Sequence, residues 1–390
     1  MKYKASLLAA IAMCGSAFIQ TSSAAEPNVP RIAIKAEAPL QLPAGWNFGE
    51  IPGVAVTSKG HVIVFSRSDK SGAAFASKAA QLFEFDQNGK FVREIAKNHF
   101  AFSFAEAVRV DKNDNIWVVD KGSNMIVKFS QEGREDVHYS RREEPQEWRP
   151  YPPRDVNKKV EATVTSPVFF GQPTDIAWDS KGDSFVSDGY LNSRVSKWEG
   201  NGGWDGVMKV WGQRGTGPGQ FYIPHGIVID NKDNVYVADR GNGRVQVFDD
   251  EGKFLRQFSL MGQVPGYSID PTVGNLNPLF MPNEPKLPRG VDPTKMRAMP
   301  EVPPEDESVV PGAPTAICIT PGPNQVLYVA DLAPSRIYKV SLEGKVLGVF
   351  GGAGGKLGEF RAPHALACQD DKTIWVADML NWRVQKITMQ

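Results

Sequence analysis

The chain has 390 residues, and its 44 lysine and arginine residues balance 44 aspartate and glutamate residues, so the formal net charge is zero. This balance gives no electrostatic reason to bind nucleic acid or an anionic membrane surface. Hydrophobic residues make up 41%, enough for a large core, and the 37 glycines and 29 prolines favour tight turns between short strands over long helices.

The N-terminus has the pattern of a secretory signal peptide. Lys2 and Lys4 precede an apolar run over residues 5–19 that is too short to span a bilayer, and small residues follow it. We therefore predict a signal peptide at residues 1–25 and a mature domain at residues 26–390. The protein is expected to be exported, periplasmic or secreted, with no integral membrane segment after cleavage.

A pattern of short β-branched and aromatic runs separated by turn residues then repeats, with about four strands in every forty residues. The first strands of its copies start at Val54, Val108, Pro173, Pro224, Pro314 and Pro363. Four-stranded units of this kind bury their faces by packing around an axis, so the pattern predicts an all-β, six-bladed β-propeller with antiparallel blades. The last copy ends at Gln390 after three strands, and Arg31–Lys35 is expected to supply the fourth and close the ring.

Two insertions, near 134–166 and 262–312, lack the strand pattern and are expected to be long surface loops. They are either decoration or a lid over a substrate, and the face that bears them could bind a protein partner.

An aspartate ends the second strand and an arginine opens the third in the regular copies. The pairs are Asp239 with Arg244, Asp331 with Arg336, and Asp378 with Arg383. Their recurrence indicates a structural ion pair or turn hydrogen bond within each blade.

Functional residues are sought where the copies differ. First strands are innermost and second strands run antiparallel to them, so first-strand starts and second-strand ends share one face. His225 and His364 follow the proline at two such starts, and Glu106 stands at the equivalent place in the second copy. Two imidazoles and a carboxylate directed at one axis form a ligand set that Zn²⁺ accepts, although Pro-His could also be an ordinary loop choice.

Two further residues depart from the repeat on the same face. The turn between Asp188 and Arg194 is one residue longer than its counterparts, which re-aims Tyr190 towards this face as a proton acceptor or donor. In the first copy Ser66 replaces the usual aspartate, so Arg67 is available for a carboxylate.

Cys318 and Cys368 remain after cleavage of the signal peptide. They align on neighbouring first strands, one register step apart, so their side chains are expected to face opposite sides as two buried free thiols.

The repeat resembles the NHL family of propellers, which shares its Pro-x-Gly, Tyr-Val-Ala-Asp and Arg-Val-Gln-Val-Phe runs. More narrowly, Pro-Thr-Asp-Ile-Ala followed by Ser-Asp-Gly-Tyr-Leu-Asn-Ser-Arg resembles peptidyl-α-hydroxyglycine α-amidating lyase. That resemblance implies a catalytic zinc bound by His225 and His364, with Tyr190 as the proton acceptor and Arg67 beside it. The family's third zinc histidine is Glu106 here, with His99 nearby if the loop is shifted.

The resemblance also implies a small-molecule or peptide substrate, an α-hydroxy amide that is split into an amide and glyoxylate. The family's structural calcium is associated with an acidic residue after the last zinc histidine; Ala365 stands there, so an additional calcium site is left open. A non-enzymatic binding propeller and a metal-dependent lactone hydrolase remain alternative functions.

Overall fold

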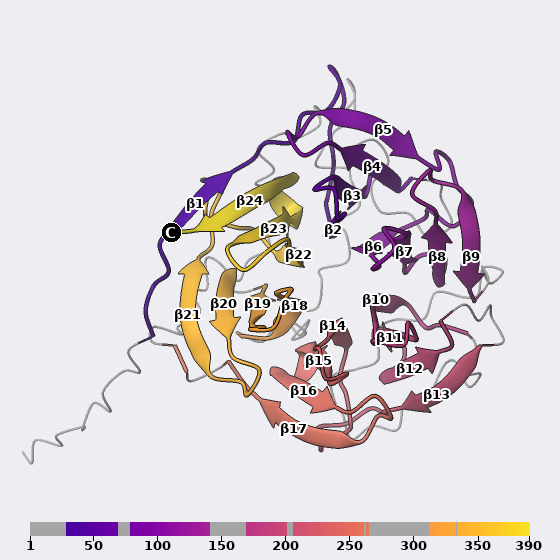
Figure 1. Ribbon diagram of the computed structural model, residues 1–390, viewed down its shortest axis with the longest axis vertical. Coiled ribbons are helices and arrows are strands. Elements are labelled where there is room, and N and C mark those ends of the chain that lie inside the picture. Colours follow the sequence, from indigo (N-terminus) through magenta and orange to yellow (C-terminus); the bar gives the residue numbers. More distant parts are fainter. Residues whose placement is uncertain are drawn as a thin grey trace, which may run out of the picture.

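The computed structural model describes residues 29–68, 79–140, 169–200, 206–260, 263–264, 312–332 and 334–390. Its strands form six four-stranded antiparallel sheets, which stand as six blades around a central axis (Figure 1). The predicted all-β, six-bladed propeller is confirmed. The expected signal peptide lies outside the described residues.

The blades follow one another in chain order, each beginning with its innermost strand. Blade 1 contains β2 (Gly53–Val56), β3 (Val62–Ser66), β4 (Gln81–Phe85) and β5 (Phe91–Ile95). Blade 2 contains β6 (Ala105–Val110), β7 (Ile116–Asp120), β8 (Met125–Phe129) and β9 (Glu135–Tyr139). Blade 3 contains β10 (Pro173–Trp178), β11 (Ser184–Asp188), β12 (Arg194–Trp198) and β13 (Val207–Trp211).

Blade 4 contains β14 (Pro224–Ile229), β15 (Val235–Asp239), β16 (Arg244–Phe248) and β17 (Phe254–Phe258). Blade 5 contains β18 (Pro314–Ile319), β19 (Leu327–Asp331), β20 (Arg336–Val340) and β21 (Val346–Gly351). Blade 6 contains β22 (Pro363–Cys368), β23 (Thr373–Asp378), β24 (Arg383–Met389) and β1 (Ile34–Glu37). Two 3-10 turns, η1 (Arg240–Asn242) and η2 (Met379–Asn381), follow β15 and β23.

The N-terminal segment closes the ring as expected. β1 pairs antiparallel with β24, with Ile34 opposite Met389 and Glu37 opposite Lys386. The expected strand at Arg31–Lys35 therefore begins three residues later than predicted, because Arg31 forms an isolated bridge to Val349 of blade 5 instead. This segment ties the last two blades together at the outer rim.

The core lies between the blades. Every residue of a second strand such as β7 is buried, whereas the outer strand β17 alternates between partly buried and exposed residues. Six apolar clusters fill the six interfaces between neighbouring blades, including the one between blades 6 and 1. This arrangement explains why inner strands read as continuous apolar runs, since both of their faces are covered.

The aspartate at the end of the second strand has the structural role that the repeat predicts. Nε of Arg244 and Nε of Arg383 each donate to Oδ2 of the paired aspartate at 2.8 Å. In blade 5 the backbone N–H of Arg336 donates to Asp331 at 2.8 Å. The predicted ion pairs and turn hydrogen bonds are therefore both present.

The prediction of two free thiols is wrong, because Cys318 and Cys368 form a disulfide with their Cα atoms 5.7 Å apart. Their strands belong to neighbouring blades, which pack face to face, so opposite faces of the two sheets meet. Both cysteines consequently contact the same apolar cluster between blades 5 and 6. Within one sheet, an offset of one residue places two side chains on opposite faces. Between two sheets packed face to face, the same offset directs both side chains into the shared interface.

The disulfide closes a loop with a sequence separation of 50 residues and is expected to stabilise the fold. Loop-closure entropy for this length corresponds to about 4 kcal/mol. Thermal unfolding should occur at a lower temperature in the presence of a reductant. The double variant Cys318→Ala/Cys368→Ala should unfold at that lower temperature with or without reductant, and equal melting of oxidised and reduced wild type would contradict the expectation.

The first insertion starts later than predicted, since β9 occupies Glu135–Tyr139 as the outer strand of blade 2. Residues 141–168 and 265–311, which make up most of the two insertions, lie outside the described residues, and so does the expected lid or decoration. No helix within the described ranges has the length and apolar character needed to cross a membrane.

Candidate functional site

The starts of first strands and the ends of second strands meet at one edge of each blade. Pro224 pairs with Asp239, Pro363 with Asp378, and Ala105 with Asp120. The residues that depart from the repeat therefore gather on one face, as the sequence predicts.

A β-bulge at the start of the first strand directs one side chain out of the regular pleat. The register shifts between Ala105 and Ala107 in β6, between Pro224 and Ile227 in β14, and between Pro363 and Ala365 in β22. Glu106, His225 and His364 lie within these bulges, and blades 3 and 5 carry Thr174 and Thr315 at the same place. Blades 2, 4 and 6 thus each present a side chain of a type that can bind a metal ion, in a threefold arrangement.

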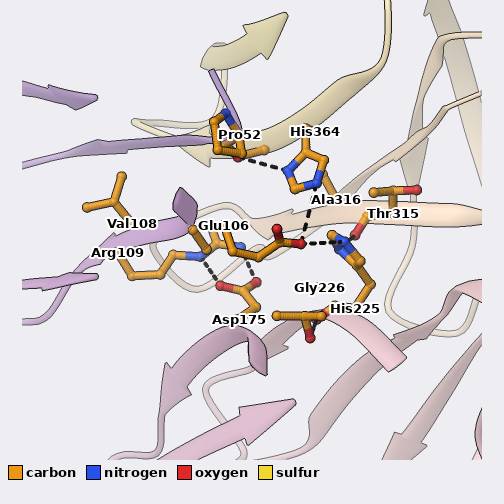
Figure 2. Close-up of a pocket in the computed structure, with 13 residues that line it drawn as sticks. Pro52, Glu106, Val108, Arg109, Asp175, His225, Gly226, Thr315, Ala316 and His364 are labelled. Carbon is orange, nitrogen blue, oxygen red and sulfur yellow. Dashed lines mark hydrogen bonds and ion pairs between the residues drawn. The ribbon is translucent and has the colours of Figure 1, made fainter. Parts of the chain in front are cut away.

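The three side chains point toward one another (Figure 2). Oε1 of Glu106 lies 3.3 Å from Nε2 of His225 and 3.6 Å from Nε2 of His364. All three residues are buried, and their ligand atoms lie within 4.8 Å of one another. The predicted set is therefore assembled as one cluster of potential ligands.

The hydrogen bonds of the imidazoles fix which nitrogen carries the proton. Nδ1 of His225 lies 3.0 Å from the carbonyl oxygen of Thr315, and Nδ1 of His364 lies 2.9 Å from that of Pro52. A carbonyl can only accept, so each Nδ1 must donate and each Nε2 of a neutral ring is left with a lone pair. Donation from Nε2 to Glu106 would require a doubly protonated imidazolium.

Burial makes that doubly protonated state unfavourable. Desolvation lowers the pKa of His225 and places the pKa of His364 well below the ordinary histidine value, although Glu106 opposes both shifts. Desolvation would also raise the pKa of Glu106, but the Lys121 ammonium and the Arg67 guanidinium hold it well below its usual range. The cluster thus consists of a carboxylate and two neutral rings whose acceptor atoms face each other.

Oε1 of Glu106 is buried and has no hydrogen-bond partner among the described residues. Three acceptors that face one another without a proton between them repel unless a cation lies among them. A divalent cation would satisfy all three, and its ligand set would match the three protein ligands of a catalytic zinc site.

Arg67 and Tyr190 both reach this cluster. Nη2 of Arg67 donates to Oε2 of Glu106 at 3.1 Å, and its Nη1 donates to Glu50 at 2.8 Å. The carboxylates that Arg67 binds in this structure are therefore side chains of the protein. The hydroxyl of Tyr190 lies 3.3 Å from Nε2 of His225. Burial, and then Glu106, raise the pKa of Tyr190, while Arg240 and Arg67 oppose the shift.

The longer turn in blade 3 depends on a glycine. A Cβ on Gly189 would lie 1.9 Å from the carbonyl oxygen of Pro224, the residue before His225. Only glycine allows the turn to approach so closely that Tyr190 contacts the histidine.

Two further cations of the site, Lys121 and Arg240, are not among the residues that the sequence pattern predicts. Nζ of Lys121 lies 3.1 Å from Oε2 of Glu106 and 3.8 Å from the centre of the Tyr190 ring. Nη1 of Arg240 donates to the Tyr190 hydroxyl at 3.4 Å. Both residues follow the aspartate that ends a second strand, at the position that Arg67 occupies in blade 1, and this shared position was the available signal.

His99 is not an alternative ligand. Its Nε2 lies 3.0 Å from Oε2 of Glu135 in the outer strand β9, and its ring contacts Phe100 and Phe102. The outer rim of blade 2 therefore holds this histidine, and Glu106 alone represents blade 2 in the cluster.

An ion pair lies beneath the cluster in the same pocket (Figure 2). Arg109 binds Asp175 through two hydrogen bonds of 2.8 and 2.5 Å, and it also donates to the carbonyl oxygens of Leu366 and Ile317. The backbone N–H of Ile227 donates to Asp175 as well. One guanidinium and its carboxylate thus connect five blades, from blade 2 to blade 6.

These contacts do not fit the additional calcium. The carboxylates that line the pocket are Glu106 and Asp175, and both oxygens of Asp175 already accept hydrogen bonds from Arg109. Ala365 supplies no oxygen from its side chain. The guanidinium of Arg109 therefore already provides the positive charge that binds Asp175 in this pocket.

Replacing Arg109 with methionine should destabilise the protein by about 3–5 kcal/mol, because Asp175 would be left buried without its partner. The double variant Arg109→Met/Asp175→Asn should recover much of this loss. Denaturant unfolding of both variants measures the difference, and equal stability of the single variant and wild type would contradict the role assigned to the pair.

The model of the NHL repeat family matches residues 221–248. Peptidylglycine alpha-amidating monooxygenase of Rattus norvegicus is 28% identical over 235 residues, which are 54% of this chain and 22% of that protein. A probable peptidyl-alpha-hydroxyglycine alpha-amidating lyase of Caenorhabditis elegans is 27% identical over 212 residues, 51% of this chain and 55% of that protein. Peptidyl-alpha-hydroxyglycine alpha-amidating lyase 1 of Drosophila melanogaster is 27% identical over 281 residues, 64% and 46% of the two chains.

Solved structures share the fold at lower identity. A streptogramin B lyase has a TM-score of 0.52 at 14% identity, covering 92% of this chain and 98% of its own. A putative gluconolactonase has a TM-score of 0.52 at 11% identity, covering 93% of this chain and 94% of its own.

The sequence matches to the curated relatives span about a fifth of the length of the rat protein and about half of the worm and fly proteins. The chain is a six-bladed β-propeller that contains an NHL repeat and is homologous, over about half of its length or more, to peptidyl-α-hydroxyglycine α-amidating lyases.

Proposed function

We propose that this protein is a zinc-dependent lyase that cleaves a peptidyl-α-hydroxyglycine, or a similar small α-hydroxy amide, to an amide and glyoxylate. The observation that carries the proposal is the cluster of three facing acceptors, Glu106, His225 and His364, with the Tyr190 hydroxyl 3.3 Å from one of them. Homology to the amidating lyases of worm and fly supports the choice of reaction.

Zinc held by Glu106, His225 and His364 would supply a Lewis acid that lowers the pKa of a coordinated hydroxyl. Arg109 and Asp175 line the same pocket further along the first strands, so we expect the substrate's α-hydroxyl to approach from the face that carries Tyr190.

Tyr190 then transfers the proton. Its oxygen accepts the hydrogen of the α-hydroxyl while the phenol's own proton passes to the departing amide nitrogen as the carbon–nitrogen bond breaks, so the phenol is neutral before and after the reaction. The reaction consumes no water and no oxidant, since the hydroxyl oxygen becomes the aldehyde oxygen of glyoxylate. Arg240 and Arg67 favour the anionic form of Tyr190 during this transfer, against the burial that raises its pKa.

The disulfide between Cys318 and Cys368 is typical of oxidising compartments. Together with the predicted signal peptide, it supports export to the periplasm or the extracellular space. The proposed partner is a small-molecule or peptide substrate that was hydroxylated elsewhere.

The test is glyoxylate release by the purified, zinc-loaded full chain from an N-acyl-α-hydroxyglycine. We expect glyoxylate and the primary amide in equal amounts, and loss of both after treatment with a chelator. Zinc binding without glyoxylate, combined with hydrolysis of a lactone, would replace the proposal with a lactonase. Absence of zinc uptake would leave a non-enzymatic binding propeller.

A further inference from the structure

Lys121 is the closest described cation to Glu106 that neither the repeat nor the family resemblance assigns. It follows β7 directly, and its side chain is only 7% exposed. Its ammonium contacts Oε2 of Glu106 at 3.1 Å and lies over the rings of Tyr190 and Phe104, at 3.8 and 4.9 Å from their centres. A carboxylate and two aromatic faces therefore hold a positive charge at this point.

Glu106 uses its two oxygens differently. Oε2 contacts two cations, Lys121 and Arg67, each at 3.1 Å, whereas Oε1 faces the two histidines. Only Oε1 is available to a metal ion, so the carboxylate would bind as a monodentate ligand. The contacts of Lys121 and Arg67 with Oε2 hold the carboxylate so that Oε1 faces the two histidines.

The charges of this group cancel. Arg67 is shared between Glu106 and Glu50, so the two carboxylates are matched by two cations only when Lys121 is included. Together with two neutral imidazoles, the surroundings of the metal position then carry no net charge from these residues. Without Lys121 the same residues would carry one negative charge.

We infer that Lys121 sets the charge of the metal site, so that Glu106 acts on the metal as a nearly neutral ligand and leaves its positive charge available to the substrate. This inference rests on the proposed zinc site. It explains how a carboxylate can stand at a position where an additional negative charge would weaken the Lewis acid.

The test is a cycle of variants read by zinc affinity, measured in competition with a chromogenic chelator. Lys121→Met should bind zinc about tenfold more tightly, because a nearby repulsive charge is removed, and should release product more slowly. Glu106→His should bind zinc about tenfold more weakly, because the lysine is left uncompensated. The double variant Glu106→His/Lys121→Met should return to the wild-type affinity, and Lys121→Arg should remain close to it.

Weaker zinc binding by Lys121→Met would assign this residue only to orienting Glu106 and would overturn the inference. A double variant that binds zinc as weakly as Glu106→His would overturn it as well, because the lysine would then act only through Glu106, and this comparison holds even if the single lysine variant folds poorly. If the affinities follow the expected order but no glyoxylate forms, the proposed reaction fails while this inference stands. If the wild type takes up no zinc, both fail.

Discussion

Substitution of His364 by alanine is expected to abolish zinc binding and lyase activity together. The variant leaves two ligands, whereas catalytic zinc sites have three from the protein. In wild type, zinc at about one hundred times its dissociation constant should add about 2.7 kcal/mol to the free energy of unfolding, and this addition should vanish in the variant. Zinc content and melting with and without zinc measure the effect.

His138→Ala is the matched control for this substitution. His138 is 45% exposed and contacts Glu135 on the outer strand of blade 2, away from the cluster. It should keep the zinc stoichiometry and the zinc-dependent rise in Tm. If His364→Ala bound zinc as well as this control, the three-ligand site would be wrong.

Replacing Tyr190 with phenylalanine should lower kcat by about 10²–10⁴ while zinc remains bound, because positioned proton transfer contributes about this factor. Phenylalanine preserves the ring under the Lys121 ammonium and removes only the hydroxyl beside His225. Steady-state kinetics and zinc content, measured on the same preparation, separate loss of the base from loss of the metal.

Tyr328→Phe provides the control for removal of a buried hydroxyl. Tyr328 is fully buried in the interface between blades 5 and 6, and its hydroxyl has no hydrogen-bond partner among the described residues. Its removal should leave kcat unchanged. Unchanged kcat in Tyr190→Phe as well would exclude the phenol from the reaction.

The repeat was sufficient to predict the blades, because strand alternation, turn residues and the Asp–Arg pair recur at a fixed spacing. It also placed Glu106, His225 and His364 on one face, since antiparallel pairing determines which strand ends meet. The bulges that turn these side chains into the channel were not predicted, because they depend on packing between blades.

The errors share a physical cause. The disulfide depends on which faces of two blades meet, and register within one sheet does not determine this. The sequence places the residues of β9 in a loop because an outer strand exposes one face, so the charged run Glu-Asp-Val-His-Tyr lacks a clear apolar pattern. In sequence Lys121 has the pattern of an ordinary turn residue, because its contact with Glu106 is formed only when β6 and β7 pair in the folded blade.

The central claim is that Glu106, His225 and His364 together bind one divalent cation. Anomalous diffraction at the zinc edge, from crystals of the zinc-loaded protein, tests it most directly. A single peak is expected on the propeller axis, about 2.0–2.2 Å from Oε1 of Glu106 and from both Nε2 atoms. A map without a peak among these three atoms, from crystals shown to contain zinc, would contradict it.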